Sequence, residues 1–259
     1  MEITKIGIMG PSGRMGKSLI TVSKEFKNLQ VVSFCDHKDS DSVGKIIDGI
    51  EVLSDLESFL KDVEIVIDFT TPNATLELLK KLSYNKLVGL VTGTTGYDAN
   101  QINQFNSYSK GLKILRASNM SYGINLLQKI CEELSSKIDD DTDIEIIETH
   151  HKHKLDAPSG TALSIGNAIK KGRDKIKKSK FVYRGINFNK KREEGDIGFS
   201  TIRGGDIIGD HSVHFFLNGE RLEISHKATD RKVFSIGALR AAVWLKKQEP
   251  GLYNLVDMV

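Results

Sequence analysis

The stretch Lys5-Ile6-Gly7-Ile8-Met9-Gly10-Pro11-Ser12-Gly13-Arg14-Met15-Gly16 places a short apolar run directly before a glycine-rich turn. The apolar run predicts a buried strand, and the apolar spacing after the turn predicts a helix through Leu19, Ile20, Val22 and Phe26. Glycines let the backbone turn tightly and approach a pyrophosphate, while the helix N-terminus attracts negative charge. The spacing is GxxGxxG rather than GxGxxG, so the turn alone is a weak indication of a phosphate site.

A second predicted strand, 31–35, strengthens this interpretation because it ends in Asp36, twenty residues after Gly16. An acidic residue at that place accepts hydrogen bonds from the adenosine ribose of a bound dinucleotide. The strand, the glycines, the helix, the second strand and its terminal acid together predict a dinucleotide site.

Strands and helices then alternate as far as residue 121, with further apolar strands expected at 64–69, 86–92 and 113–117. Such alternation predicts parallel β-α-β units with right-handed crossovers. We therefore expect an α/β chain whose first part, residues 1–121, is a Rossmann-like dinucleotide-binding domain with a parallel sheet.

The pattern changes after residue 121, where a helix over 125–137 is followed mainly by strands. Asn218-Gly219 between the runs 210–217 and 220–227 predicts a hairpin. We expect residues 122–231 to form a second α+β domain with a mainly antiparallel or mixed sheet. A last apolar helix over 233–247 is expected to return residues 232–259 to the first domain.

In the second domain, Glu148-Thr149-His150-His151-Lys152-His153-Lys154-Leu155-Asp156-Ala157-Pro158-Ser159-Gly160-Thr161 carries titratable side chains into a predicted helix start. The stretch follows a predicted strand over 144–147, and ligands gather at the C-terminal ends of parallel strands. Its last four residues offer a rigid entry, a capping hydroxyl and backbone N–H groups suited to a carboxylate. Taken alone, the stretch also fits a polar loop before a capped helix.

The composition, with 39% hydrophobic and 27% charged residues, is that of a soluble globular protein. Cys35 and Cys131 lie in apolar runs without metal spacing, so we expect reduced core thiols. The sequence contains no run of about 18 apolar residues and no secretory leader. We therefore expect a cytoplasmic protein without a membrane partner.

Positive charge is concentrated in residues 170–192, which hold eleven basic residues and one acid. A nucleic-acid patch is one interpretation, but the segment has three aromatic residues and no nucleic-acid motif. We expect a solvated helix end and loop that attracts an anionic substrate, and no nucleic-acid partner.

The sequence contains the motifs Gly10-x-x-Gly13-Arg14-Met15-Gly16, Asp68-Phe69-Thr70, Thr92-Gly93-Thr94-Thr95-Gly96, the His150–Thr161 stretch and Arg203-Gly204-Gly205-Asp206-Ile207-Ile208-Gly209-Asp210-His211. Together they resemble the 4-hydroxy-tetrahydrodipicolinate reductase family, also called dihydrodipicolinate reductase. The resemblance implies NADH- or NADPH-dependent reduction of a cyclic dicarboxylate in diaminopimelate and lysine biosynthesis. The product would be 2,3,4,5-tetrahydrodipicolinate, formed from 4-hydroxy-2,3,4,5-tetrahydrodipicolinate after loss of water gives an unsaturated imine. It also implies a homotetramer assembled through the second domains.

The resemblance further implies roles for individual residues. Cofactor-binding positions would be Gly10, Pro11, Ser12, Gly13, Arg14, Met15, Asp36, His37, Gly93, Thr94, Thr95, Ala117, Ser118, Asn119 and Met120. Substrate would contact His151, Gly160 and Thr161, with His150 and Lys154 as the catalytic pair. This agrees with the chemistry, because hydride addition to a conjugated imine leaves electron density that a positioned acid must protonate. Pro11 replaces the Ala that is more common in the family, which removes one N–H from the phosphate loop. His37 replaces the Arg that is common in members that hold the phosphate of NADP, which leaves the choice between NADH and NADPH open.

Two other classes of function compete with this interpretation. One is a metal-dependent hydrolase using His150, His151 and His153, although neighbours on a strand point to opposite faces and no cysteine accompanies them. The other is a dinucleotide sensor or nucleic-acid binder without catalysis. We expect an enzyme that holds no metal.

Overall fold

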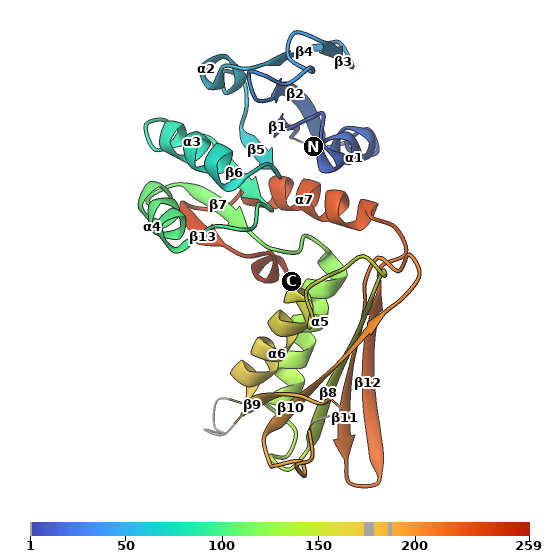
Figure 1. Cartoon of the computed structure of the whole chain (residues 1–259). Coiled ribbons are helices and arrows are strands. Elements are labelled where there is room, and N and C mark those ends of the chain that lie inside the picture. Colours follow the sequence, from blue (N-terminus) through green and yellow to red (C-terminus); the bar gives the residue numbers. More distant parts are fainter. Residues whose placement is uncertain (1, 174–178, 186–187) are drawn as a thin grey trace. The chain divides into compact units, whose positions relative to one another are not determined.

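The computed structural model describes residues 2–173, 179–185 and 188–259. Within these residues the chain divides into two units, the first comprising residues up to Ser121 with Lys232–Met258 and the second Tyr122–Arg231. Each unit is built on its own sheet (Figure 1). No helix in the described ranges is both long and apolar enough to cross a membrane.

In the first unit, strands and helices follow one another as far as residue 116. Three further elements of this unit come from the C-terminal part of the chain. In chain order its elements are β1 (Thr4–Met9), α1 (Arg14–Ser23), β2 (Leu29–Cys35), β3 (Ile46–Ile47), β4 (Ile50–Leu53), α2 (Leu56–Phe59), β5 (Ile65–Asp68), α3 (Pro72–Leu82), β6 (Gly89–Thr92), α4 (Ala99–Tyr108), β7 (Lys113–Arg116), α7 (Lys232–Leu245), β13 (Gly251–Tyr253) and the 3-10 helix η1 (Leu255–Met258).

Among the described residues, the strand order of this unit is β13-β7-β6-β5-β1-β2-β4-β3. The neighbouring strands are parallel, except that β3 and β4 form an antiparallel pair. The chain runs from β1 to β2 on one side and then returns to β5 on the other side of β1. Such a reversal opens a crevice at the carboxyl ends of the strands, where dinucleotides bind in sheets of this type.

Helices cover both faces of this sheet (Figure 1). Helices α1 and α7 pack on one face through Leu19 and Leu239, against Ile6 and Ile67. Helices α2, α3 and α4 pack on the other face, where Phe105 of α4 is fully buried. Each central strand is buried on both sides, which explains why the strands are continuous apolar runs rather than alternating ones.

The second unit has two helices on one face of a mixed sheet (Figure 1). Its elements are α5 (Tyr122–Ser135), β8 (Asp143–His150), α6 (Gly160–Gly172), β9 (Lys180–Tyr183), β10 (Asp196–Arg203), β11 (Asp210–Leu217) and β12 (Glu220–Lys227). In the described ranges the strand order is β12-β11-β8-β10-β9, antiparallel from β12 to β8 and parallel from β8 to β9.

Strand β8 lies in the middle of this sheet and alternates between its two faces. Ile144 and Ile146 point to the face that α5 and α6 cover and are fully buried. Because side chains on a strand alternate, Glu148 and His150 fall on the same face. Two polar residues thus continue an apolar core row, and both are buried.

The predicted fold class is confirmed, since a mostly parallel sheet carries the dinucleotide-type crevice and a mixed sheet forms the second unit. The hairpin predicted from Asn218-Gly219 is present, with Gly219 at a φ of 83° in the turn between β11 and β12. The short edge strands β3, β9 and β13 were not predicted. Strand β9 lies inside the basic segment that we expected to be helix end and loop, while residues 174–178 and 186–187 of that segment lie outside the described residues.

Candidate active site

The glycine-rich turn of the first unit links β1 to α1. Gly10 has a φ of +68°, which L-residues rarely adopt. A Cβ on Gly16 would lie 2.2 Å from the carbonyl oxygen of Gly10, so only glycine permits this close packing of helix against turn. Gly13 caps α1 without a side-chain hydrogen bond, which leaves the first N–H groups of the helix to a ligand.

Asp36 directly follows β2 and faces the same crevice. Its Oδ2 accepts hydrogen bonds from the hydroxyls of Ser12 (2.5 Å) and Ser42 (2.8 Å), and its Oδ1 accepts one from the N–H of His37 (2.9 Å). Burial by itself raises the pKa of Asp36, but these hydrogen bonds outweigh it and hold the pKa below its usual value. A carboxylate has about four lone-pair sites, so this anion keeps acceptor capacity for a ribose hydroxyl.

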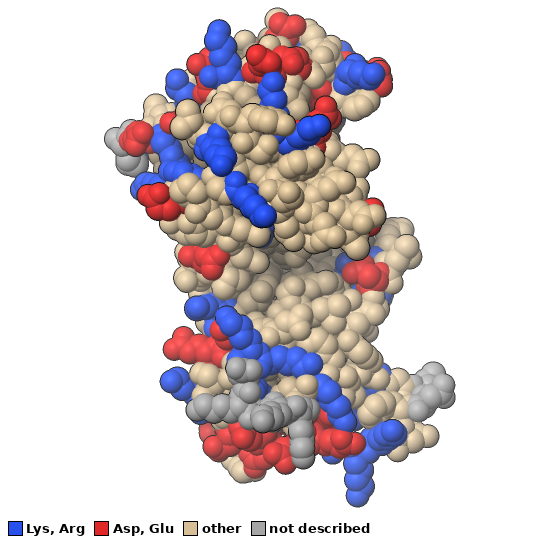
Figure 2. Space-filling view, turned by 90° about the vertical axis from the view of Figure 1, so that its left-hand side faces the viewer, with Lys and Arg blue, Asp and Glu red and all other residues tan. Residues whose placement is uncertain are grey.

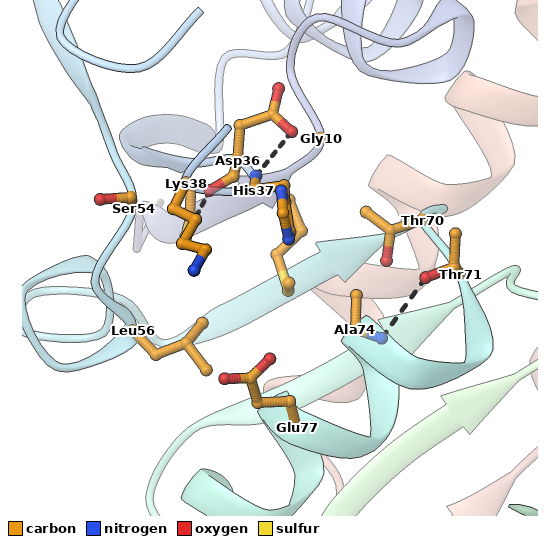
Figure 3. A pocket seen from close by; sticks show the side chains of 12 residues that line it. Gly10, Asp36, His37, Lys38, Ser54, Leu56, Thr70, Thr71, Ala74 and Glu77 are labelled. Carbon is orange, nitrogen blue, oxygen red and sulfur yellow. Dashed lines mark hydrogen bonds between the residues drawn. The ribbon is translucent and has the colours of Figure 1, made fainter. Parts of the chain in front are cut away.

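A cavity of about 520 Å³ lies beside Asp36. Figure 3 shows Asp36, His37 and Lys38 on one side of it and Thr70, Thr71 and Glu77 on the other. Apolar side chains of Met9, Cys35, Leu56 and Ala74 also line it, together with Gly10 and Ser54. A cavity of this size with both apolar and polar side chains, next to a carboxylate suited to a ribose, fits an adenine ring. The residues present therefore fit the adenosine half of a dinucleotide.

Glu148 is the centre of the polar cluster in the second unit. Its carboxylate is fully buried and accepts hydrogen bonds from Nη1 (2.8 Å) and Nη2 (2.7 Å) of Arg203, which reaches it from β10. The hydroxyl of Thr201 and the N–H of Ser159 each donate to it at 3.1 Å. Burial raises the pKa of Glu148, but the hydrogen bonds from Arg203 and His150 outweigh it and lower the pKa overall.

His150 is the remaining partner of Glu148, with Nδ1 at 2.5 Å from Oε2. Burial lowers the pKa of His150, Glu148 opposes this, and the positive charges of Lys154 and Arg203 add to the lowering. The imidazole is therefore mainly neutral at neutral pH, with its proton on Nδ1, because an ionised carboxylate only accepts hydrogen bonds. Nε2 lies beside Gly209, where an added Cβ would come within 3.0 Å of it.

Lys154 lies at the start of the loop between β8 and α6. Its Nζ donates to Oδ1 of Asp156 at 2.8 Å. This hydrogen bond is the main reason that the pKa of Asp156 is lowered, and the backbone of Gly160 at the start of α6 contributes. One carboxylate thus already interacts with both Lys154 and the N-terminus of α6. The same two groups suit a carboxylate of a ligand.

Ser159 caps the start of α6, and His211 contacts Ser159. The Ser159 hydroxyl accepts from the N–H of Ala162 at 3.1 Å and lies 3.2 Å from Nε2 of His211. The ring of His211 packs edge-on against that of His150, with centroids 5.2 Å apart. Burial, together with the neighbouring His150, lowers the pKa of His211 to about 3, so this histidine is a neutral structural partner.

Comparison with known proteins identifies the family to which these two sites belong. The family described as "Dihydrodipicolinate reductase, N-terminus" matches residues 4–120, and "Dihydrodipicolinate reductase, C-terminus" matches residues 123–259. This chain belongs to the dihydrodipicolinate reductase family. It is therefore an oxidoreductase, as the sequence motifs predicted, and not a sensor without catalysis.

Individual relatives support the same assignment. The 4-hydroxy-tetrahydrodipicolinate reductase of Pseudomonas fluorescens (strain Pf0-1) is 40% identical over 98% of both chains, and that of Roseobacter denitrificans is 39% identical over 98% of this chain and 96% of its own. A solved dipicolinate-bound dihydrodipicolinate reductase from Paenisporosarcina sp. TG-14 superposes with a TM-score of 0.80 at 25% identity, covering 99% of this chain and 100% of its own.

The residues predicted to bind the cofactor of this reductase all lie in the first unit, and those predicted to bind substrate or act in catalysis all lie in the second. Ala117, Met120 and Thr94 are buried. In the second unit, His150 and Lys154 interact electrostatically, and Nδ1 of His151 is buried without a hydrogen-bond partner in the described chain.

Glu148 and Arg203 were quoted within motifs of the sequence and Thr201 was not, and we predicted no role for any of the three. The sequence does contain a signal for Glu148. It continues the row of Ile144 and Ile146 at a period of two, so an acid was to be expected in the core of this reductase. Nothing in the local sequence indicates that Arg203, 55 residues later, neutralises it.

Two further observations concern the competing interpretations, a metal-dependent hydrolase and a nucleic-acid binder. Among the described residues, no group of three or more His, Cys, Asp and Glu is arranged to hold a metal ion. In the basic segment, Lys171, Lys180, Arg184 and Arg192 form ion pairs with acids of the same unit. Acidic side chains lie among the basic ones on the face shown in Figure 2.

We expect His211 to make the stability of the reductase sensitive to acid. Its pKa is about 3 in the folded chain, against 6.5 for an unperturbed histidine. Between these values the unfolded chain binds a proton that the folded chain does not, so the free energy of unfolding falls by about 1.4 kcal/mol per pH unit as the pH drops. Urea unfolding near pH 7 and pH 5 should show about 2 kcal/mol less loss in His211→Gln than in the wild type.

His153→Gln is the control for this prediction, because His153 is exposed. It should keep the pH dependence of the wild type. Equal acid sensitivity of His211→Gln and the wild type would contradict the prediction that His211 is neutral in the folded chain.

Proposed function

We propose that this chain uses a nicotinamide dinucleotide to reduce 4-hydroxy-2,3,4,5-tetrahydrodipicolinate, after loss of water, to 2,3,4,5-tetrahydrodipicolinate. The observation that carries the proposal is the cluster of His150, Lys154 and the N-terminus of α6 in a chain of this family. The solved relative is named as bound to dipicolinate, a planar ring dicarboxylate, which supports the same class of ligand for this chain.

Binding of the substrate is assigned to groups that favour anions. One ring carboxylate would replace Asp156 beside Lys154 and the first N–H groups of α6, at Gly160 and Thr161. His151 would provide a further polar contact. Exchange of one anion for another at this place costs little electrostatic energy, because Lys154 keeps a negatively charged partner in both states.

Protonation of the reduced substrate is assigned to His150 and Lys154. A nicotinamide cofactor, when bound, would supply a hydride for the unsaturated imine, and the electron pair displaced onto the ring would require a proton from the protein. Glu148 holds Nδ1 of His150, so Nε2 is the atom that would take up a proton and then transfer it to the substrate. The ammonium of Lys154, whose positive charge contributes to the lowered pKa of His150, is the alternative donor.

Binding of the dinucleotide is assigned to the first unit. The turn from Gly10 to Met15 would hold the pyrophosphate and Asp36 a ribose diol, with Gly93–Thr95 and Ala117–Met120 along the rest of the cofactor. The enzyme would act in the cytoplasm, where the reduced thiols Cys35 and Cys131 are stable. Loss of nicotinamide absorbance on addition of substrate tests the proposed function directly.

We expect His150→Gln and Lys154→Ala each to lower kcat by roughly 10² to 10⁴, the usual contribution of a positioned acid or base. Dinucleotide affinity should stay nearly unchanged, because both residues lie in the other unit. Lys154→Ala should also raise KM for the dicarboxylate. Steady-state kinetics with dinucleotide titrations distinguish these effects.

Two further variants sharpen this test. His153→Gln should stay within about threefold of wild type, because His153 is exposed and makes no contact with the Glu148 cluster that the structure describes. Gly209→Ala should lower kcat, because its Cβ would lie within 3.0 Å of Nε2 of His150. If His153→Gln lost as much activity as His150→Gln while remaining folded, the assignment within this cluster would be wrong.

We expect NADH to be used at least as well as NADPH. The ionised Asp36 favours ribose hydroxyls and repels a 2′-phosphate, while His37 and Lys38 partly offset this repulsion. Asp36→Ala should shift the preference towards NADPH. A wild-type kcat/KM that favours NADPH by more than about tenfold would mean that the basic neighbours outweigh the acid.

We expect a homotetramer assembled through the sheet of the second unit. The face of this sheet away from α5 and α6 carries Ile202 and Phe216, which are 51% and 38% exposed. Uncovered apolar side chains on a sheet face suit a contact with a second copy. Light scattering should give the tetramer mass at micromolar concentrations, and a monomer mass across that range would refute the proposal.

A further inference from the structure

Asp68, the last residue of β5, is a fully buried carboxylate for which the proposed reaction has no use. In the described structure, hydrogen-bond donors on three segments converge on it. Thr70 donates through its N–H (3.0 Å) and its hydroxyl (2.5 Å) to Oδ1, and the hydroxyls of Thr75 (2.5 Å), Thr92 (3.0 Å) and Thr94 (3.1 Å) approach Oδ2. An ionised carboxylate suits this set, because it accepts at both oxygens.

The same carboxylate holds the loop that follows β6. Thr94 is bound to Asp68 through its hydroxyl, and its N–H donates to the hydroxyl of Thr92 at 3.2 Å. The N–H of Gly93 donates to the backbone carbonyl of Asp68 at 3.0 Å, and Gly93 packs so closely on the ring of Phe69 that a Cβ would lie 2.1 Å from it. Residues 92–94 are therefore fixed to Asp68 and Phe69 at several points.

The position of this loop relative to a bound dinucleotide follows from the strand order. Asp36 lies at the end of β2 and the glycine turn at the end of β1, whereas β5 and β6 lie on the opposite side of β1. A dinucleotide that places its adenosine ribose at Asp36 and its pyrophosphate at the turn must extend its other nucleoside over β5 and β6.

We propose that Asp68 is a positioning residue for the nicotinamide half of the cofactor. It touches no reactant. It acts by holding residues 92–94 in the conformation that their backbone needs to contact the nicotinamide nucleoside. The inference rests on the proposed function, because it assumes that the first unit binds a dinucleotide. The adenosine half, held at Asp36, should not depend on Asp68.

This separation between the two halves gives the experiment. NADH carries both halves, whereas ADP-ribose lacks the nicotinamide. Calorimetric titration of the full chain should show that Asp68→Asn and Thr94→Val each weaken NADH binding about tenfold, while ADP-ribose binding changes by less than about twofold. Thr94→Ser keeps the hydroxyl and should bind NADH within about threefold of wild type.

A double variant tests whether the effect passes through one interaction. If Thr94 acts through Asp68, Asp68→Asn with Thr94→Val should weaken NADH binding little more than the stronger single variant. Fully additive losses would overturn the proposal. It would also be overturned if Thr94→Val weakened NADH binding while Asp68→Asn did not, since Thr94 would then contact the cofactor independently of Asp68.

The remaining outcomes are equally decisive. Equal weakening of NADH binding and ADP-ribose binding would indicate general damage to the fold. Unchanged NADH binding in Asp68→Asn would show that residues 92–94 need no support from Asp68. Either result rejects the proposal. If Asp68→Asn does not fold, the contrast between Thr94→Val and Thr94→Ser decides. A wild-type chain that binds neither molecule would instead refute the proposed function.

Discussion

A carboxylate without access to water must obtain all its hydrogen bonds from the protein, and both units of this reductase are organised around one such group. Glu148 in the second unit and Asp68 in the first are fully buried. An unpaired buried charge costs several kcal/mol, so the segments that supply the donors are constrained to stay where the structure shows them. In both units these segments are the strand ends and loops that carry the proposed site residues.

The two carboxylates differ in the charge of their partners, and this fits their different surroundings. Asp68 is surrounded by threonine hydroxyls and one backbone N–H, which fix loops without adding positive charge beside the crevice. Glu148 is bound by the guanidinium of Arg203, which neutralises it. Arg203 also donates to the carbonyl of Asp156 at 2.6 Å, so the same side chain fixes the loop before α6.

Local patterns allowed much of the fold and part of the site to be predicted. The glycine turn is recognisable because Gly10 and Gly16 meet steric demands within a few residues, and Asn218-Gly219 specifies a hairpin by itself. Contacts between distant residues have no such signal, as with Arg203 and Thr201 at Glu148 or Thr94 at Asp68. The edge strands β9 and β13 were not predicted, because runs of four and three residues are too short to show a periodicity.

Arg203 also decides what kind of partner Glu148 is for His150. A buried carboxylate alone would raise the pKa of a neighbouring histidine and keep it charged. Here Glu148 shares its charge with Arg203, and burial together with the positive charges of Lys154 and Arg203 lowers the pKa of His150 overall. Glu148 therefore orients the ring of His150 without raising the pKa of His150 overall. An imidazolium formed in this environment gives up its proton readily, which is the property that a donor to a reduced imine requires.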